Sequence, residues 1–287
     1  MRAPYRLDLT ANALRRLSSN VVDVYEGGAY RRLAGDGAAP QLIEVRQTQE
    51  DELTVRLHGA GAVDGAALVR RMLGTDVDLD HFYTAAVEIP WLFALVERAR
   101  GVKPPRYPSL WETVVNSVVY QQISIHAAAA ILRRVIERYA AVRIVSGVRL
   151  APFPTPQVIA DAQPGDLRTL GLSANKIVAL RTLARAILEG ELDEDALERL
   201  PTPELVAGLE RAKGVGPWTA AVIALRGFGR LDIFPMKDSG VARTLKDLSG
   251  DPDVDAARIL ALLGPQRGML YYHLLLGRLA ARGEVTL

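Results

Sequence analysis

Residues 214–238 read GVGPWTAAVIALRGFGRLDIFPMKD, and this stretch carries the most structural information in the chain. A helical pattern ends at Lys213, two glycines bracket one aliphatic residue, and a second helical pattern begins at Pro217. Glycine lets the backbone turn tightly and leaves its amide groups unobstructed. Proline fits the first position of a helix because an N–H there has no partner within the helix. The stretch therefore predicts two helices joined by a tight hairpin.

The predicted hairpin offers a site for an anion. Free backbone amides at the N-terminus of its second helix, beside the glycine turn, suit a phosphate group. Helix hairpins with glycine also occur as packed turns that bind nothing. The hairpin alone leaves both interpretations open.

An acidic residue stands at the next transition from loop to helix. Asp238 comes directly before Ser239, where the helical pattern resumes. Because Asp favours the N-cap position, one interpretation is a structural cap. The other is a carboxylate that takes part in chemistry.

The chain upstream of the hairpin divides into a β-rich beginning and a long helical part. Short helices are expected after Thr10 and after Asp64, since both residues suit the N-cap position. From about residue 78, apolar residues recur at i, i+3 and i+4, which predicts helices. Four earlier runs mix β-branched and alternating residues between turn clusters and predict strands: Arg6–Thr10, Val21–Tyr25, Gln41–Gln47 and Leu53–Leu57.

The expected fold class is α+β: a small antiparallel sheet with helices at the N-terminus, followed by two all-α lobes that contain the helix–hairpin–helix. Residues 1–77 are predicted to form a mixed α/β domain, and 78–108 connecting helices and a Pro-rich linker. Residues 109–230 are predicted to form a helical domain with the helix–hairpin–helix at 204–227. The last segment, 231–287, is predicted to complete a cleft.

The amino-acid composition excludes several kinds of functional site. The 287 residues include no cysteine, which excludes disulfides, zinc–thiolate sites and cysteine nucleophiles. The four histidines never fall at metal-ligand spacing, and the net charge is only +2, so any basic face must be local. No window approaches the ~18 apolar residues of a membrane span. We therefore expect a cytoplasmic protein with no membrane partner.

Together, the hairpin, its spacing to Asp238 and the acidic residue before the next helix resemble the helix–hairpin–helix DNA glycosylase superfamily. The resemblance is closest to the 3-methyladenine DNA glycosylase II (AlkA-like) branch and covers nearly the whole chain. The segment SVVYQQISIHAAA, residues 117–129, resembles the helix and turn that enter the DNA minor groove in that branch. The β-rich N-terminus is similar to the branch's additional α/β domain.

The resemblance implies a base excision repair enzyme. It would flip alkylated purines of the 3-methyladenine or 7-methylguanine type out of duplex DNA and hydrolyse the N-glycosidic bond. Members with lyase activity carry a lysine nucleophile where this chain has Trp218, which implies a monofunctional enzyme. The partner is double-stranded DNA with damaged bases, the protein acts as a monomer associated with the nucleoid, and no cofactor is implied.

The resemblance also assigns roles to residues. Asp238 corresponds to the catalytic carboxylate, which stabilises a sugar cation or aligns the attacking water, and the neighbouring Lys237 is a second, weaker candidate for covalent chemistry. No metal is essential, although a monovalent cation can bind the backbone of Gly214 and Gly216. The residues expected to line the substrate pocket are Trp218, Tyr120, Tyr271, Tyr272 and Val222. Those expected to contact DNA are Gln121, Gln122, Ile123, Ser124, Lys213, Gly214, Val215, Gly216 and Thr219, with Gln122 filling the gap left by the flipped nucleotide.

Two alternatives remain open. Val222 and Leu275 stand where the branch has further aromatic residues, so the enzyme could act instead on deaminated or oxidised bases. A non-catalytic helix–hairpin–helix protein that grips DNA phosphates is the other alternative. Release of a base from damaged DNA separates the enzymes from the binding protein.

Overall fold

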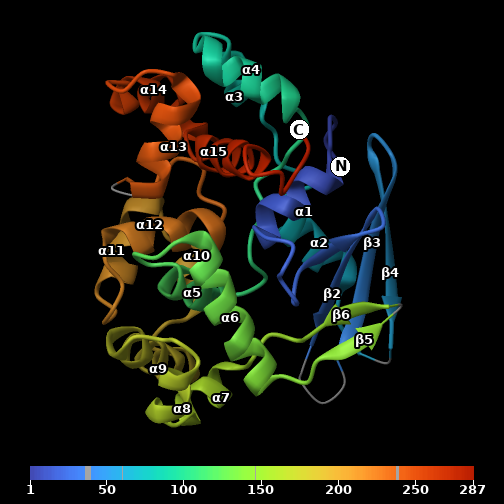
Figure 1. The fold of residues 1–287 in the computed structure, drawn as a ribbon, viewed down its shortest axis with the longest axis vertical. Helices are drawn as coiled ribbons and strands as arrows, with labels where there is room; N and C mark the ends of the chain where they lie inside the picture. The colour runs from blue at the N-terminus through green and yellow to red at the C-terminus, as the bar shows by residue number, and fades with distance from the viewer. Residues whose placement is uncertain (36–39, 60, 146, 237–238) are drawn as a thin grey trace.

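A four-stranded antiparallel sheet forms one side of the molecule and helices form most of the rest (Figure 1). The computed structural model describes residues 1–35, 40–59, 61–145, 147–236 and 239–287. The strands follow one another in sequence order across the sheet. They are β1 (Val24–Glu26), β2 (Ala29–Ala34), β3 (Gln41–Gln49) and β4 (Glu52–His58).

Two helices cover one face of the sheet. They are α1 (Leu7–Arg15) and α2 (Gly65–Leu73). Val45, which pairs with Tyr30 of β2 and Val55 of β4, is fully buried in the cluster that α1 and α2 form with the sheet. The Asp64 carboxylate accepts a hydrogen bond from Ala67 N at 3.0 Å, so the predicted cap of α2 is confirmed.

The predicted strand at Arg6–Thr10 is wrong, because these residues begin α1. Leu7, Ala11 and Leu14 are buried on one helical face, a spacing that the short alternating run concealed. Thr10 is inside the helix rather than at its N-cap, and its hydroxyl accepts a hydrogen bond from Lys103 N at 3.1 Å.

A small hairpin interrupts the helical part of the chain. Its strands, β5 (Arg143–Val145) and β6 (Val148–Leu150), were not predicted. Val148 and Leu150 pack against Leu33 and Leu42 of the sheet. Strands of three residues are too short to show an alternating pattern in the sequence. Their contact with the four-stranded sheet stabilises them.

The remaining helices form two packed groups. The first contains α5 (Leu110–Val119), α6 (Ile125–Tyr139), α7 (Pro156–Asp161), α8 (Pro164–Thr169), α9 (Ala174–Leu188), α10 (Glu194–Glu198), α11 (Thr202–Glu210) and α12 (Pro217–Arg226). The second contains α3 (Asp80–Ala86), α4 (Pro90–Arg98), α13 (Ser239–Ser249), α14 (Ala256–Leu263), the 3₁₀ turn η1 (Gly264–Gln266) and α15 (Met269–Ala280).

Helix α12 belongs to both groups. Ile223 is buried in the first group's core and Leu225 in the second group's core. Helix α1 packs against α15 through Leu9 and Ala13, so the N-terminal region also reaches the second group. The predicted α+β class, a small sheet followed by helical lobes with a helix–hairpin–helix, is confirmed.

The proline-rich segment 102–109 is held in the interior rather than exposed as a linker. Arg106 N donates to Met72 O of α2 at 2.9 Å, and Tyr107 N donates to Arg226 O of α12 at 2.8 Å. Both neighbouring prolines, Pro104 and Pro105, are buried. The segment therefore joins the N-terminal region to α12 by backbone hydrogen bonds.

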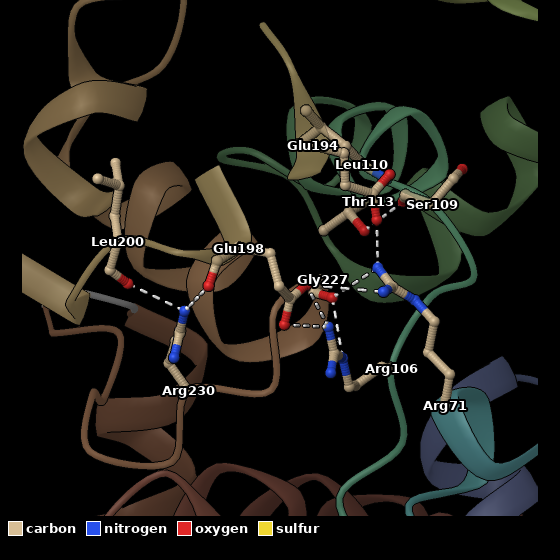
Figure 2. Close-up of polar contacts among 10 residues, drawn as sticks. All are labelled: Arg71, Arg106, Ser109, Leu110, Thr113, Glu194, Glu198, Leu200, Gly227 and Arg230. Atoms are coloured by element: carbon tan, nitrogen blue, oxygen red, sulfur yellow. Dashed lines mark hydrogen bonds and ion pairs between the residues drawn. The ribbon is translucent and has the colours of Figure 1, made fainter. Parts of the chain in front are cut away.

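Arginines gather at the C-terminal end of α12 (Figure 2). Arg106 donates through Nε to Gly227 O at 3.0 Å and through Nη2 to Glu198 at 3.0 Å. Arg71 of α2 also reaches Gly227 O, at 3.4 Å, and pairs with Glu194 of α10. Cations are stabilising at a helix C-terminus, so this network braces the helix whose other end carries the hairpin.

Within the described part of the chain, no helix combines the length and the apolar character that crossing a membrane requires.

Candidate functional site

The turn between α11 and α12 is the predicted hairpin, and its first glycine is required by the packing. Gly214 has φ +93°, and a Cβ there would lie 2.5 Å from Ala179 Cβ of α9. Val215 is buried in the helical core, while Lys213, Gly216 and Pro217 are exposed. The N-cap residue of α12 is Gly216, which has no side chain to cap the helix, and open space surrounds the position of its Cβ. The hairpin is therefore anchored by one side chain and presents its backbone to solvent.

A second exposed loop connects α5 to α6. Ser124 caps α6 by accepting a hydrogen bond from Ala127 N at 3.2 Å. Gln122 has φ +57°, which is uncommon for a residue other than glycine, and Ile123 keeps 38% of its surface exposed. We call residues 121–124 the wedge loop, since the resemblance places the DNA-entering turn there.

Hydrogen bonds join the wedge loop to the hairpin. Gln121 Nε2 donates to Thr219 Oγ1 at 2.7 Å and to Gly214 O at 3.2 Å. Lys176 of α9 donates from Nζ to Val119 O at 2.9 Å and to Gln121 O at 2.8 Å, and burial lowers the pKa of this amine. The two loops are thus fixed relative to each other.

A cavity of about 970 Å³ opens beside these loops. The wedge loop, the start of α12, α13, α15 and the end of α1 surround it. Its size is that of a site for a small organic group such as a nucleobase with its sugar. The hairpin and the cavity share Gly216, Pro217 and Trp218, so a phosphate on the hairpin would lie next to the cavity mouth.

Three of the five predicted pocket residues line this cavity: Trp218, Tyr120 and Tyr271. Tyr272 and Val222 do not, which corrects the prediction. Both are fully buried in the core, and the Tyr272 hydroxyl donates to Pro105 O at 3.1 Å. Successive residues on a helix point about 100° apart, so α15 can present only one of the two tyrosines.

The aliphatic replacement Leu275 also lines the cavity, one turn beyond Tyr271 on α15. Of the predicted DNA-contacting residues, Gln121, Gln122, Ile123, Ser124, Gly216 and Thr219 border it as well. Lys213 and Gly214 lie on the exposed hairpin outside it, and the side chain of Val215 faces the core.

Asp238 and Lys237 lie outside the described residues. Gly240 and Val241, which follow them at the start of α13, line the cavity. Among the described residues, no group of three or more His, Cys, Asp or Glu side chains could hold a metal ion.

The cavity wall also contains residues that were not predicted, among them Arg16. Arg16, at the end of α1, keeps only 5% of its surface exposed, and its guanidinium lies 3.9 Å from the centre of the Tyr120 ring. Its Nη2 is 3.5 Å from the Tyr271 hydroxyl. Burial lowers the pKa of Arg16, but the surrounding tyrosines Tyr107, Tyr271 and Tyr120 raise it above the ordinary value, so the group stays charged. An arginine at a helix end usually faces water, so no sequence signal marks this position as part of a cavity.

Two arginines near the hairpin have structural roles. Arg226 is fully buried and donates from Nη2 to Ala13 O and Leu14 O, each at 3.0 Å, which caps the C-terminal end of α1. Arg230 donates to Leu200 O at 3.0 Å (Figure 2). Lys213 and Arg211 remain exposed on the hairpin side.

Comparison with known proteins identifies the family of the chain. Residues 115–263 match the model of the HhH-GPD superfamily base excision DNA repair protein. The chain belongs to this superfamily. A DNA-3-methyladenine glycosylase of Bacillus subtilis is 27% identical over 254 residues, which cover 85% of this chain and 84% of that protein.

A second relative is a longer protein than this chain. The probable bifunctional transcriptional activator/DNA repair enzyme AlkA of Mycobacterium tuberculosis is 32% identical over 261 residues, or 86% of this chain and 50% of that protein. The predicted assignment to an AlkA-like helix–hairpin–helix glycosylase family is confirmed.

Solved structures share the fold. A 3-methyladenine DNA glycosylase from Archaeoglobus fulgidus superimposes with a TM-score of 0.79 at 22% identity and covers 97% of both chains. An 8-oxoguanine glycosylase/lyase of Clostridium acetobutylicum in complex with double-stranded DNA gives 0.75 at 17% identity, covering 98% of this chain and 93% of that one. At these identities the likeness concerns the fold alone.

Proposed function

We propose that this superfamily member is a monofunctional DNA glycosylase that flips alkylated purines out of duplex DNA and hydrolyses their N-glycosidic bond. The observation that carries the proposal is the cavity beside the exposed hairpin, with Trp218 and Tyr271 on its wall. A base stacked in duplex DNA is inaccessible, so an enzyme that acts on its glycosidic bond must extrude it. The names of the relatives support alkylated bases as the substrates.

Binding is proposed to use both loops. The backbone amides of the hairpin hold a phosphate at the N-terminus of α12, where the N-cap residue is a glycine, and Lys213 adds an exposed positive charge. The wedge loop enters the duplex with Gln122 and Ile123, which occupy the gap left by the extruded nucleotide. Because Gln121 ties the loops together, phosphate binding and gap filling occur in one fixed geometry.

The chemistry is proposed to need one carboxylate and an aromatic wall. A purine alkylated at N3 or N7 carries a positive charge, so its glycosidic bond is already weakened and it stacks well on electron-rich rings. Trp218 and Tyr271 supply such rings. Positive charge then develops on the sugar as the base leaves, and the Asp238 carboxylate stabilises it or aligns the attacking water.

The absence of lyase chemistry is inferred from one position. Trp218 stands where bifunctional relatives of the superfamily carry a lysine nucleophile, and an indole cannot form a Schiff base. Borohydride reduction during turnover is expected to trap no covalent adduct between enzyme and DNA. A trapped adduct that disappears in Lys237→Ala would assign the lyase step to Lys237 instead.

The proposed partner is double-stranded DNA carrying damaged bases, bound by a monomer in the cytoplasm at the nucleoid. A second candidate, a glycosylase for deaminated or oxidised bases, is favoured by one observation: the charged Arg16 in a cavity that the resemblance predicts to be aromatic.

The test is base release from duplex DNA that contains 3-methyladenine and 7-methylguanine, followed by chromatography of the free bases. Release supports the proposal. Binding to duplex DNA without release of any base would instead make the protein a binding module.

A further inference from the structure

The amine of Lys176 binds the backbone where α5 ends and the wedge loop begins. Its Nζ donates to Val119 O at 2.9 Å and to Gln121 O at 2.8 Å. The last carbonyl groups of a helix have no partner within that helix, and a cation beside them is stabilising. Both acceptors are backbone groups, so this amine fixes a chain conformation rather than neutralising an acidic side chain.

The residue after the second of these carbonyls has an unfavourable backbone conformation. Gln122 has φ +57°, at a position after a helix where glycine is usual. A side chain in this region brings its Cβ close to a carbonyl oxygen, so contacts around the residue must hold it there. The oxygen that Lys176 binds belongs to the peptide group between Gln121 and Gln122. Lys176 therefore holds one of the two peptide groups that flank the strained residue.

Helix α9, which carries Lys176, also contacts the hairpin. Ala179 lies one turn beyond Lys176, and a Cβ on Gly214 would come within 2.5 Å of the Ala179 Cβ. The helix packs against α5 and α7, with Leu180 and Leu183 buried in the helical core. The wedge loop and the hairpin thus both rest on one well-packed helix.

We propose that Lys176 is a positioning residue for base extrusion, which keeps Gln122 and Ile123 projecting from the protein in the conformation that enters the duplex. This inference rests on the proposed glycosylase function. Lys176 does not line the cavity, so its replacement leaves the wall around Trp218 in place. Its loss should therefore affect the step that brings the base into the cavity and not the bond cleavage that follows.

The energy of extrusion explains why the conformation of the loop matters. Taking a paired base out of the duplex costs its stacking and pairing energy. Side chains that fill the gap offset part of that cost, provided that the loop already holds them in the right conformation. Without Lys176, Gln122 is free to leave positive φ, and the extruded state becomes less populated. The observed rate of release falls with that population.

The experiment compares single-turnover release of 7-methylguanine from two duplexes, one with the lesion paired to cytosine and one with the lesion as a single-base bulge. Extrusion of a bulged base leaves no partner base without a neighbour, so gap filling matters less there. For Lys176→Met, the ratio of the paired rate to the bulged rate is expected to fall by about tenfold, the typical effect of losing hydrogen bonds from a charged donor. Lys176→Arg keeps the charge and the donors and should restore the ratio. Arg185→Met is the matched control, because it removes an exposed cation from the last turn of the same helix.

An equal loss of both rates in Lys176→Met would show a purely structural role and overturn the inference, as would an unchanged ratio. A second measurement needs no catalysis and separates the inference from the proposed function. It records the fluorescence of 2-aminopurine opposite a stable abasic analogue, which changes when the wedge loop enters the stack, at saturating protein. If the wild type released no base at all, the proposed function would fail. A smaller fluorescence change with Lys176→Met than with Arg185→Met would still support the inference, and equal changes would contradict it.

Discussion

Gln121 Nε2 donates a hydrogen bond of 2.7 Å to Thr219 Oγ1, and this bond crosses between two elements that are 98 residues apart in the chain. Gln121 belongs to the wedge loop and Thr219 to the first turn of α12. The same amide also donates to Gly214 O of the hairpin. The amide of Gln121 therefore holds the two loops in a fixed position relative to each other, a role in addition to the DNA contact predicted from the sequence.

Gln121→Ala is expected to loosen the connection between the wedge loop and the hairpin. Loss of two hydrogen bonds should weaken binding to a duplex with an abasic site by about 1–3 kcal/mol, because the hairpin and the wedge loop no longer present one fixed surface. Fluorescence anisotropy measures the affinity. Gln163→Ala is the control, since Gln163 is exposed and its side chain does not cap α8. Equal affinities for the two variants would show that the Gln121 bonds do not matter for binding.

The hairpin glycines are expected to differ in their tolerance of a side chain. Gly214→Ala places a Cβ against Ala179 at positive φ and should destabilise the fold by about 1–3 kcal/mol. Gly216→Ala has room for its Cβ and should fold normally, while its new methyl group hinders a phosphate from approaching the backbone. Chemical denaturation and DNA titration measure the two effects. Gly165→Ala, also in open space, should change neither.

Because Trp218 lines the cavity and Tyr272 does not, substitutions of these two aromatic residues are expected to have different effects. Trp218→Ala removes a ring from the cavity wall and should lower the rate of base release by at least about tenfold, the effect of 1.4 kcal/mol in the transition state. Tyr272→Phe removes only a hydroxyl that bonds Pro105 O in the core and should cost about 1 kcal/mol of stability without slowing release. A slower release by Tyr272→Phe would restore this residue to the pocket.

Stability is expected to depend on pH through Glu112. The pKa of Glu112 is raised to about 7, because burial and the nearby Asp23 carboxylate together outweigh the lowering effect of Arg32, with which both carboxylates pair. The folded state therefore holds a proton on Glu112 that the unfolded chain releases near pH 4.5. The contribution of Glu112 to the free energy of unfolding is complete below that pH. It decreases as the pH rises to about 7, by up to about 1.4 kcal/mol per pH unit.

Glu112→Gln stays neutral and should lack this contribution to the pH dependence. Comparing its free energy of unfolding with that of the wild type from pH 4 to 8 isolates the effect, with Glu191→Gln on the surface as control. A difference between Glu112→Gln and wild type that stays constant over this range would contradict the account.

Local sequence patterns were sufficient to predict the elements that depend only on a few neighbouring residues. The hairpin at Gly214–Gly216 and the cap at Asp64 depend on backbone conformation and local hydrogen bonding, so sequence was sufficient for both. The strand β2 was missed because Arg31 and Arg32 look exposed in sequence. In the structure both are buried and paired with carboxylates, Arg31 with Glu44 and Arg32 with Asp23.

The composition of the cavity depended on contacts over long distances. Tyr271 and Tyr272 are equivalent in sequence, and only the rotation of α15 against α12 decides which one reaches the cavity. Arg16 reaches it because Arg226, 210 positions later in the chain, fixes the end of α1. Neither relationship has a local signature in the sequence.

The most direct test of the central claim is release of methylated purines from duplex DNA by the wild type and by Asp238→Asn, measured in single turnover. The wild type is expected to release 3-methyladenine or 7-methylguanine, and the variant is expected to bind the duplex with similar affinity but to release neither. Near-normal release by Asp238→Asn would contradict the proposed mechanism. Failure of the wild type to release any damaged base, with duplex binding intact, would contradict the proposed function itself.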